Sequence, residues 1–194
     1  MFVMTIDQRG SRKDVDRVGA ILRTLADRTL VRQFERTAGD EIQGVTDNPD
    51  IVVDIALDLV RDGHWSVGIG IGEVEEPLPP QTRAGRGPAF EAARVAVTRA
   101  KNAPAAVAVN GSDTQAAEDV EAVLTLLALL IIKRSTQGHA AVDQMRMGLT
   151  QSEAADKLAI SKQAVSQRLS TAGWQAEGPA RALAARLLGE ADNR

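Results

Sequence analysis

The 194-residue sequence contains no cysteine and no tyrosine, only two histidines, and only 3% aromatic residues. Without cysteine the chain has no disulfide framework, no thiolate nucleophile and no cysteine-ligated zinc, and two histidines exclude a histidine-rich metal site. Because aromatic residues are scarce, the core has to consist of valine, isoleucine, leucine and alanine. A hydrophobic content of 44% is enough for such a core and excludes a wholly disordered chain.

Long apolar runs are also absent. The most apolar stretch, residues 123–132, is about ten residues long and is followed by Lys133 and Arg134, whereas a membrane span needs about twenty residues. The amino-terminal residues lack the basic, apolar and small-residue order of a signal peptide. We therefore expect a soluble, cytoplasmic protein with no membrane partner.

The net charge of −3 is unevenly distributed along the chain. Residues 1–132 carry 14 basic and 20 acidic side chains, whereas residues 133–194 carry nine basic and six acidic ones. An acidic body followed by a basic tail is typical of a nucleic-acid-binding unit attached to another domain, although a charge difference of this size also occurs by chance.

Hydrophobic periodicity predicts alternating strands and helices in the first part of the chain. Strands are predicted at 2–6, 30–36, 42–45, 65–71 and 105–109, and helices at 14–25, 49–61 and 88–101. In the first of these helices, Val15 and Val18 are expected on the inner face. The order of elements predicts an α+β domain with the ferredoxin-like alternation. The glycines at 68, 70 and 72 fall within a strand, which favours close backbone packing over a phosphate-binding loop.

A long helix is predicted from residue 116 to about residue 133, with apolar residues around nearly its whole circumference. We expect it to be buried against the preceding domain, a partner chain, or both. A core helix is the simpler interpretation, and a dimerisation helix is the alternative. The chain is accordingly divided into an α+β domain at 1–112, a connecting or dimerisation helix at 113–136, and an all-α DNA-binding domain at 137–194.

Residues 149–174 carry the most specific pattern in the sequence. Thr150 and Glu153 have the spacing of a capping box and predict the start of a helix that ends near residue 158. After a short break, Ser161 is placed to cap a second helix over residues 162–172. The small Ala155 suits a close crossing of the two helices. This pattern resembles the helix-turn-helix of bacterial regulators, winged or simple, with Ala159 where the turn often has glycine.

The outer face of the second predicted helix is polar and basic. Glutamine can bond adenine through two hydrogen bonds, and lysine, arginine and serine suit phosphates or base edges. We therefore expect a homodimer that binds double-stranded DNA, with the recognition helices about one helical turn of DNA apart. A helical hairpin with a solvated polar face is the alternative. The predicted DNA-binding residues are Ser161, Lys162, Gln163, Ser166, Gln167 and Arg168.

Two carboxylates follow predicted strands at one end of the expected sheet. Asp7 ends the first strand, and Asp40 lies at the tip of the hairpin between strands 30–36 and 42–45. If these strands are neighbours, both carboxylates project from the same end, where oxygen ligands could hold Mg²⁺ together with a nucleotide. The alternative is that both aspartates only shape turns, which is a common use of this residue.

Four segments occur in an order that resembles the SatD-like family, a relative of class III nucleotidyl cyclases and diguanylate-cyclase palms. They are Asp7-Gln-Arg-Gly-Ser, Arg36-Thr-Ala-Gly-Asp-Glu41, Val67-Gly-Ile-Gly-Ile-Gly72 and Ala89-Phe-Glu-Ala-Ala-Arg94. The resemblance covers roughly residues 1–110. It implies metal or nucleotide binding at Asp7, Asp40 and Glu41, and ligand contacts by Arg36 and Arg94.

The chain departs from the cyclase pattern at several positions. Phe90 stands where an asparagine is expected, Arg36 replaces a purine-selecting lysine, and no purine-reading aspartate is evident. Losing such contacts removes orientation and charge stabilisation. We therefore expect a degenerate palm that serves as a sensor of a small nucleotide or as a dimerisation module, and a transcriptional regulator overall. The alternative is a metal-dependent nucleotidyl cyclase or nucleotide hydrolase regulated by a helix-turn-helix tail.

Three arginines form a further candidate site. Arg83, Arg86 and Arg94 could surround an anionic ligand, although a solvated loop explains the first two as well.

Overall fold

The computed structural model describes residues 1–193 and, for Arg12, the backbone alone. It contains a five-stranded mixed sheet with the strand order β2-β3-β1-β4-β5. β1 is antiparallel to both of its neighbours, β3 and β4, whereas β5 is parallel to β4. The sheet and its helices confirm the predicted α+β class. The strands are β1 (Phe2–Gln8), β2 (Arg32–Arg36), β3 (Glu41–Thr46), β4 (Trp65–Ile71) and β5 (Val107–Gly111).

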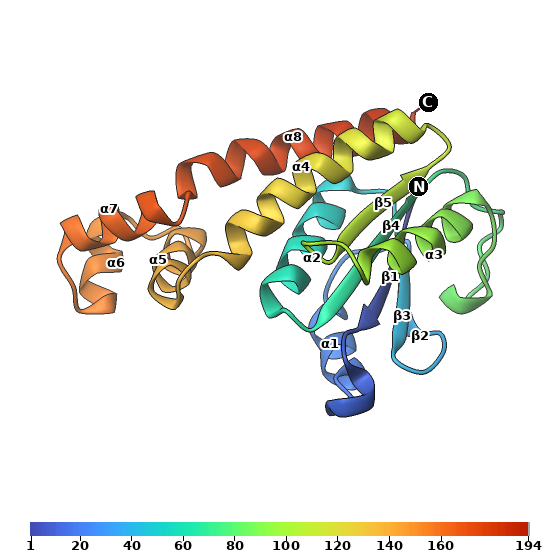
Figure 1. Ribbon diagram of the computed structural model, residues 1–194, viewed down its shortest axis with the longest axis horizontal. Coiled ribbons are helices and arrows are strands. Elements are labelled where there is room, and N and C mark those ends of the chain that lie inside the picture. The colour runs from blue at the N-terminus through green and yellow to red at the C-terminus, as the bar shows by residue number, and fades with distance from the viewer. Residues whose placement is uncertain (194) are drawn as a thin grey trace.

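The helices cover both faces of the sheet and extend beyond it (Figure 1). The α-helices are α1 (Val18–Leu25), α2 (Pro49–Asp62), α3 (Pro88–Ala100), α4 (Thr114–Ile132), α5 (Thr136–Arg146), α6 (Gln151–Leu158), α7 (Lys162–Thr171) and α8 (Trp174–Asp192). α2 and α4 pack on one face of the sheet and α3 on the other. α5, α6 and α7 form a separate three-helix cluster, which α4 and α8 connect to the sheet domain (Figure 1).

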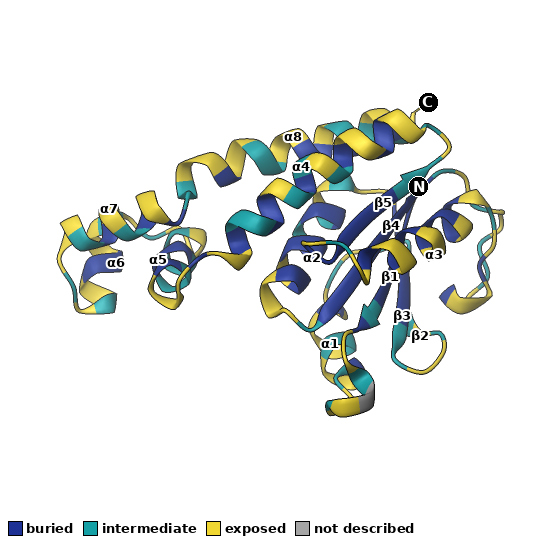
Figure 2. Ribbon diagram, viewed as in Figure 1, coloured by how far each residue is buried: buried dark blue, intermediate teal, exposed yellow. Residues whose placement is uncertain are grey.

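The two sheet faces follow from residue alternation along the strands. On β1, Phe2, Met4 and Ile6 belong to the large core that also contains residues of α2, α4 and α8, whereas Val3 packs with residues of α3. β1, β3, β4 and β5 are therefore buried along most of their length (Figure 2), whereas the edge strand β2 buries only Phe34. As composition predicts, aliphatic side chains and alanine make up most of this core.

Two glycines of β4 allow α3 to lie unusually close to the sheet. A Cβ atom at Gly68 would lie 2.2 Å from the backbone nitrogen of Val97, and one at Gly70 would lie 2.1 Å from the carbonyl oxygen of Ala89. Both contacts are far shorter than van der Waals distance, so no side chain fits at either position. The interpretation of this glycine alternation as close helix packing is confirmed.

The predicted helix at 14–25 begins four residues too early. α1 begins at Val18, and Val15, expected on the inner face, is 68% exposed. The side chain of Gln8 holds the preceding segment instead: its Nε2 donates to the carbonyl of Val15 at 2.7 Å, and its Oε1 accepts from the backbone N–H of Arg17 at 2.9 Å. Local apolar spacing does not reveal such a competing side-chain contact.

α4 packs against α2, α8 and β5, so its predicted burial against the preceding domain is confirmed. Leu126, on its outer side, remains 70% exposed. α8 differs from the expected division of the chain. It lies along α4, and its residues Ala184 and Leu188 belong to the core of the sheet domain although the sequence places them in the DNA-binding segment.

Residues 112–193 contain helices and turns but no strand, so the winged form of the carboxy-terminal segment is wrong for the described residues. Arg194, the last residue of that segment, lies outside them. None of the helices described is both long and apolar enough to cross a membrane.

Candidate nucleic-acid interface

The three-helix cluster has a small core of its own. Ala154 and Ala155 of α6 face Val165 and Leu169 of α7, and all four side chains are buried. The alanines leave room for the two helices to approach closely, as the sequence predicts for Ala155. α5 closes the third side and contributes further buried residues, Ala141 and Val142.

Capping side chains define the ends of α6 and α7. Thr150 Oγ1 accepts a hydrogen bond from the backbone N–H of Glu153 at 3.3 Å, and Glu153 Oε2 accepts from the backbone N–H of Thr150 at 2.7 Å. The predicted capping box is therefore confirmed. Ser161 caps α7 by accepting a hydrogen bond from the backbone N–H of Ala164 at 3.1 Å.

The turn between α6 and α7 depends on one residue in a left-handed conformation. Ala159 has φ of 52° and ψ of 45°, a region that favours glycine. The following N–H, of Ile160, donates to the carbonyl of Ala155 at 3.0 Å, which gives this N–H a partner just beyond the end of α6. The Ile160 side chain packs against the cluster core.

The polar residues predicted to bind DNA lie at the start of α7 and along it, and Figure 2 shows that much of this helix is exposed. Arg168 is half-buried, and the other five residues are exposed. Within the described part of the chain, the side chains of Lys162, Gln163 and Arg168 have no hydrogen-bond or ion-pair partner, so they are free to contact another molecule. Gln167 makes one long contact, from its Nε2 to Thr171 Oγ1 at 3.3 Å.

A buried glutamate fixes the cluster relative to the sheet domain. Glu177 of α8 accepts hydrogen bonds from Arg134 at 2.6 Å and from Arg181 at 2.8 Å, and it also pairs with Arg146 at the end of α5. The side chains of Arg134 and Glu177 are only 1% and 2% exposed. Burial raises the pKa of Glu177, but the hydrogen bonds and charges of the arginines outweigh it and hold the pKa at about 2, below the ordinary 4.5.

Sequence reasoning missed this network. Arg134, Arg146 and Arg181 come from three different segments, and they converge only because α8 returns along α4. Glu177 lies among small residues near the start of α8. An acidic side chain at such a position is normally explained by its favourable interaction with the positive end of the helix dipole. No local pattern distinguishes it from a solvated residue.

The cluster also contacts α2 directly. Arg61 of α2 donates to both carboxylate oxygens of Asp143 on α5, at 2.6 and 2.7 Å. The hydrogen bond from Arg61 lowers the pKa of Asp143 below its ordinary value. Together with the contact from Arg181 to Asp54 at 2.9 Å, this pair ties both α5 and α8 to the same helix of the sheet domain.

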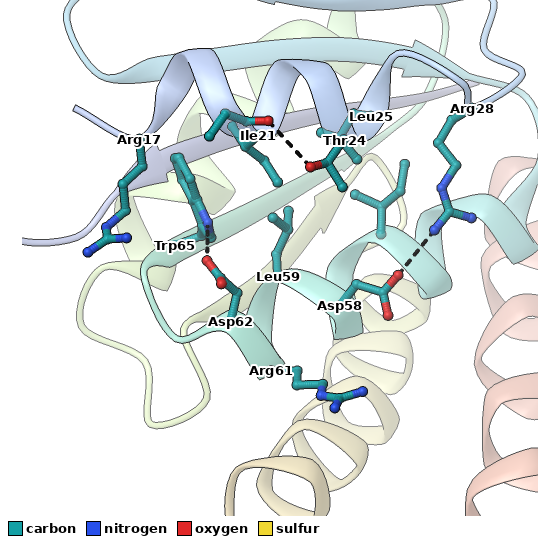
Figure 3. A pocket seen from close by; sticks show the side chains of 12 residues that line it. Arg17, Ile21, Thr24, Leu25, Arg28, Asp58, Leu59, Arg61, Asp62 and Trp65 are labelled. Atoms are coloured by element: carbon teal, nitrogen blue, oxygen red, sulfur yellow. Dashed lines mark hydrogen bonds and ion pairs between the residues drawn. The ribbon is translucent and has the colours of Figure 1, made fainter. Parts of the chain in front are cut away.

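A groove of about 610 Å³ lies between α1 and α2 (Figure 3). Its floor includes Leu25 and Leu59, and its rim carries charged groups that are already paired. Arg28 Nη2 is 3.1 Å from Asp58 Oδ2, and the Trp65 indole N–H donates to Asp62 at 2.8 Å. Because Arg61 also lines this groove, the groove adjoins the contact with α5.

The predicted metal-binding carboxylates come from one end of the sheet. Asp7 lies opposite Glu41 in the pairing of β1 with β3, and the N–H of Gln8 donates to the carbonyl of Asp40 at 3.3 Å. Asp7 forms an ion pair with Lys101 at 2.8 Å, just beyond the end of α3. The residues described contain no group of three or more acidic or histidine side chains arranged to hold a metal ion.

The two predicted ligand-binding arginines lie at different places. Arg36 contacts both carboxylate oxygens of Asp16, at 2.6 and 2.7 Å. Arg94 lies on the exposed side of α3 and lines a pocket together with Arg83 and Arg86. The structure therefore groups Arg94 with the two loop arginines, as one alternative in the sequence analysis suggests, and not with Arg36.

Comparison of the chain with protein-family models, with curated proteins and with solved structures finds no match. The function therefore has to be inferred from the geometry of the three-helix cluster and from the residues that it exposes.

Proposed function

We propose that this protein is a cytoplasmic, homodimeric, DNA-binding transcriptional regulator. In this proposal α6 and α7 form a helix-turn-helix, α7 is the recognition helix, and the sheet domain is a sensor or dimerisation module. The observation that carries the proposal is the outer side of α7, where Lys162, Gln163 and Ser166 are exposed and have no side-chain partner among residues 1–193. This helix is capped at its start and packed from behind by α5 and α6. Such a helix can enter a major groove without exposing its own core.

The chemistry of this row suits a duplex. Gln163 and Gln167 lie one helical turn apart, so both amides point to the same side and can reach adjacent base edges. Lys162 and Arg168 have no acidic partner among the described residues, which leaves their charges available to phosphates.

For the sheet domain, we propose a degenerate cyclase-like palm. The antiparallel order β2-β3-β1-β4 supports the ferredoxin-like core of such a palm. Phe90, at the position of the expected asparagine, is 2% exposed and packs in the core. Asp7 and Arg36 are engaged in ion pairs within the chain. These contacts support a sensor or dimerisation role better than catalysis.

The experiment is selection of bound sequences from random DNA duplexes by the full-length protein, followed by affinity measurements at several salt concentrations. Changing Gln163→Ala should alter preference at one base pair by about 1–3 kcal/mol. Changing Lys162→Gln should weaken binding to all sequences and reduce the salt slope by about one. Gln115→Ala, at an exposed position on α4, is the matched control and should change neither property.

Two results would contradict the proposal. One is binding that does not depend on salt, since phosphate contacts release counterions. The other is an equal loss of affinity for selected and random DNA in Gln163→Ala, because a base-reading residue must affect the two differently.

A metal-dependent nucleotidyl cyclase or nucleotide hydrolase is the second candidate. It is favoured by one observation, the position of Asp7, Asp40 and Glu41 at the same end of the sheet. The purified protein should be incubated with each nucleoside triphosphate and Mg²⁺ or Mn²⁺. Turnover that is lost in Asp40→Asn would assign an enzymatic function to the sheet domain.

A further inference from the structure

A second charged surface lies at the end of the molecule opposite the three-helix cluster (Figure 1). It is a pocket of about 530 Å³ between the loop that follows β4 and the first half of α3. We call it the arginine pocket. Its charged lining residues are Arg83, Arg86, Arg94, Glu75 and Glu91.

The loop that forms one wall of the pocket is held against β2 by side-chain hydrogen bonds. The guanidinium of Arg32 donates to the carbonyls of Leu78 at 2.6 Å and Pro79 at 2.7 Å. The hydroxyl of Thr82, a buried residue, donates to the carbonyl of Gln33 at 2.7 Å. These contacts hold a proline-rich segment that lacks regular strand pairing, so the pocket wall is formed before any ligand arrives.

The floor is equally constrained. The ring of Phe90 is buried directly beneath Gly85, where a Cβ atom would lie 2.1 Å from the ring. The N–H of Glu75 donates to the carbonyl of Arg86 at 2.9 Å, which joins the two ends of the loop. A wall and floor of this kind reduce the entropy that is lost when a ligand binds.

The arginines of the pocket differ from most others in the protein because acidic side chains do not neutralise them. Arg83 contacts only the neutral amide of Gln81, at 3.3 Å, and Arg86 and Arg94 have no ion-pair partner within residues 1–193. Arg99, on the same helix as Arg94, is by contrast paired with Glu121 at 2.8 Å. The arginine pocket therefore brings together three guanidinium groups that form no ion pair in the described chain. They outnumber the two carboxylates of the pocket, Glu75 and Glu91, which leaves a net positive charge for an external anion.

We propose that the arginine pocket binds the phosphate group of a small phosphorylated molecule that also carries hydroxyl donors. Planar guanidinium groups match phosphate oxygens through paired hydrogen bonds, which assigns the phosphate to Arg86 and Arg94. Glu75 and Glu91 have only acceptor atoms when ionised, so they can receive hydrogen bonds from the hydroxyl groups of the same ligand. The volume lies within the usual range for small-molecule sites, roughly 300–1,000 Å³. This site does not depend on DNA binding by α7.

The experiment is calorimetric titration of the full-length protein with inorganic pyrophosphate and with glucose 6-phosphate, at constant ionic strength. Both should bind with a stoichiometry of one, and Arg86→Gln or Arg94→Gln should weaken both by about tenfold or more. Arg186→Gln is the matched control, because Arg186 is an exposed arginine on α8 whose partner is Glu190, one turn away. It should leave both affinities unchanged.

A second variant separates the phosphate contact from the hydroxyl contact. Glu75→Gln removes a negative charge beside the phosphate and should increase the affinity for pyrophosphate. The affinity for glucose 6-phosphate should increase less, or decrease, because the variant also loses an acceptor for the sugar hydroxyls. Absence of binding by both probes would overturn the proposal, and so would an equal loss in Arg186→Gln, which would indicate attraction by net charge alone. DNA binding by the same variants should be unchanged, so failure here is distinguishable from failure of the regulator proposal.

Discussion

Arg61 of α2 and Asp143 of α5 are joined by two hydrogen bonds of 2.6 and 2.7 Å, between the sheet domain and the three-helix cluster. The paired geometry is the strongest form of arginine–carboxylate contact. Both side chains are about one-third exposed, at 33% and 31%, so solvent weakens the contribution to stability. The pair therefore serves chiefly to set the position of the cluster.

The first prediction concerns this pair. Asp143→Asn removes the negative charge that Arg61 faces and should lower the free energy of unfolding by no more than about 1 kcal/mol. Amide hydrogen exchange in α5, α6 and α7 should nevertheless become faster than exchange in the sheet. A double-mutant cycle with Arg61→Gln measures the coupling. A coupling energy of zero would show that the two side chains do not interact in solution.

The second prediction concerns the buried glutamate. Glu177→Gln leaves Arg134 buried without a full counter-charge, and it should lower the free energy of unfolding by about 3–5 kcal/mol. Urea denaturation at neutral pH measures the loss. Glu190→Gln, at an exposed position of the same helix, should change stability by less than about 0.5 kcal/mol. Equal effects in the two variants would mean that burial of the ion-pair network is not maintained in solution.

The third prediction follows from the pKa of the same glutamate. Its folded value of about 2 lies below the ordinary 4.5, so the ionised form stabilises the folded state. This contribution is fully present above pH 4.5 and is lost as the pH falls from 4.5 toward 2, by roughly 3 kcal/mol in total. Denaturation at a series of acidic pH values should show a shallower loss of stability in Glu177→Gln than in the native chain.

The fourth prediction tests the turn between α6 and α7. Ala159→Gly relieves the left-handed strain of an alanine at φ of 52° and should raise the free energy of unfolding by about 0.5–1 kcal/mol. Ala122→Gly, at an exposed site in the middle of α4, should lower it by a similar amount because glycine disfavours helix. Thermal denaturation distinguishes these opposite signs. Destabilisation by Ala159→Gly would show that the turn has another conformation.

The fifth prediction tests the contact between β4 and α3. Gly70→Ala places a methyl group 2.1 Å from the carbonyl oxygen of Ala89, and it should cost about 3 kcal/mol or more. Gly178→Ala is the matched control, because a Cβ atom there meets nothing within 4 Å. It should stabilise α8 by about 0.5–1 kcal/mol. The two variants should therefore move the urea midpoint in opposite directions.

Local pattern was sufficient to predict most of the secondary structure. The strands, α2, α3, α4 and the capped α6 and α7 each have a strong apolar period or a side-chain cap in their own sequence. The start of α1 was wrong because Gln8, several residues earlier in the chain, binds the backbone at Val15 and Arg17. Contacts of this kind depend on the position of a neighbouring strand, and apolar spacing does not encode them.

The candidate interface on α7 was predictable because its capping and burial pattern are local. The arrangement around Glu177 was not, since it requires α8 to lie along α4 and bring Arg134 and Arg181 to one carboxylate. The arginine pocket was only partly predictable from the sequence. Their charge makes Arg83, Arg86 and Arg94 candidates in the sequence, but their convergence depends on a loop anchored by Arg32, for which the sequence predicts only a place in a strand.

The three-helix cluster is joined to the rest of the chain twice, by α4 entering it and by α8 leaving it side by side (Figure 1). A domain joined by a single linker can rotate, whereas one joined by two adjacent helices keeps a defined orientation. The ion pairs of Asp143 with Arg61 and of Glu177 with Arg134 add to this restraint on the orientation of α7. In the proposed homodimer, the distance between the two α7 helices would therefore be fixed by the surface through which the two chains associate.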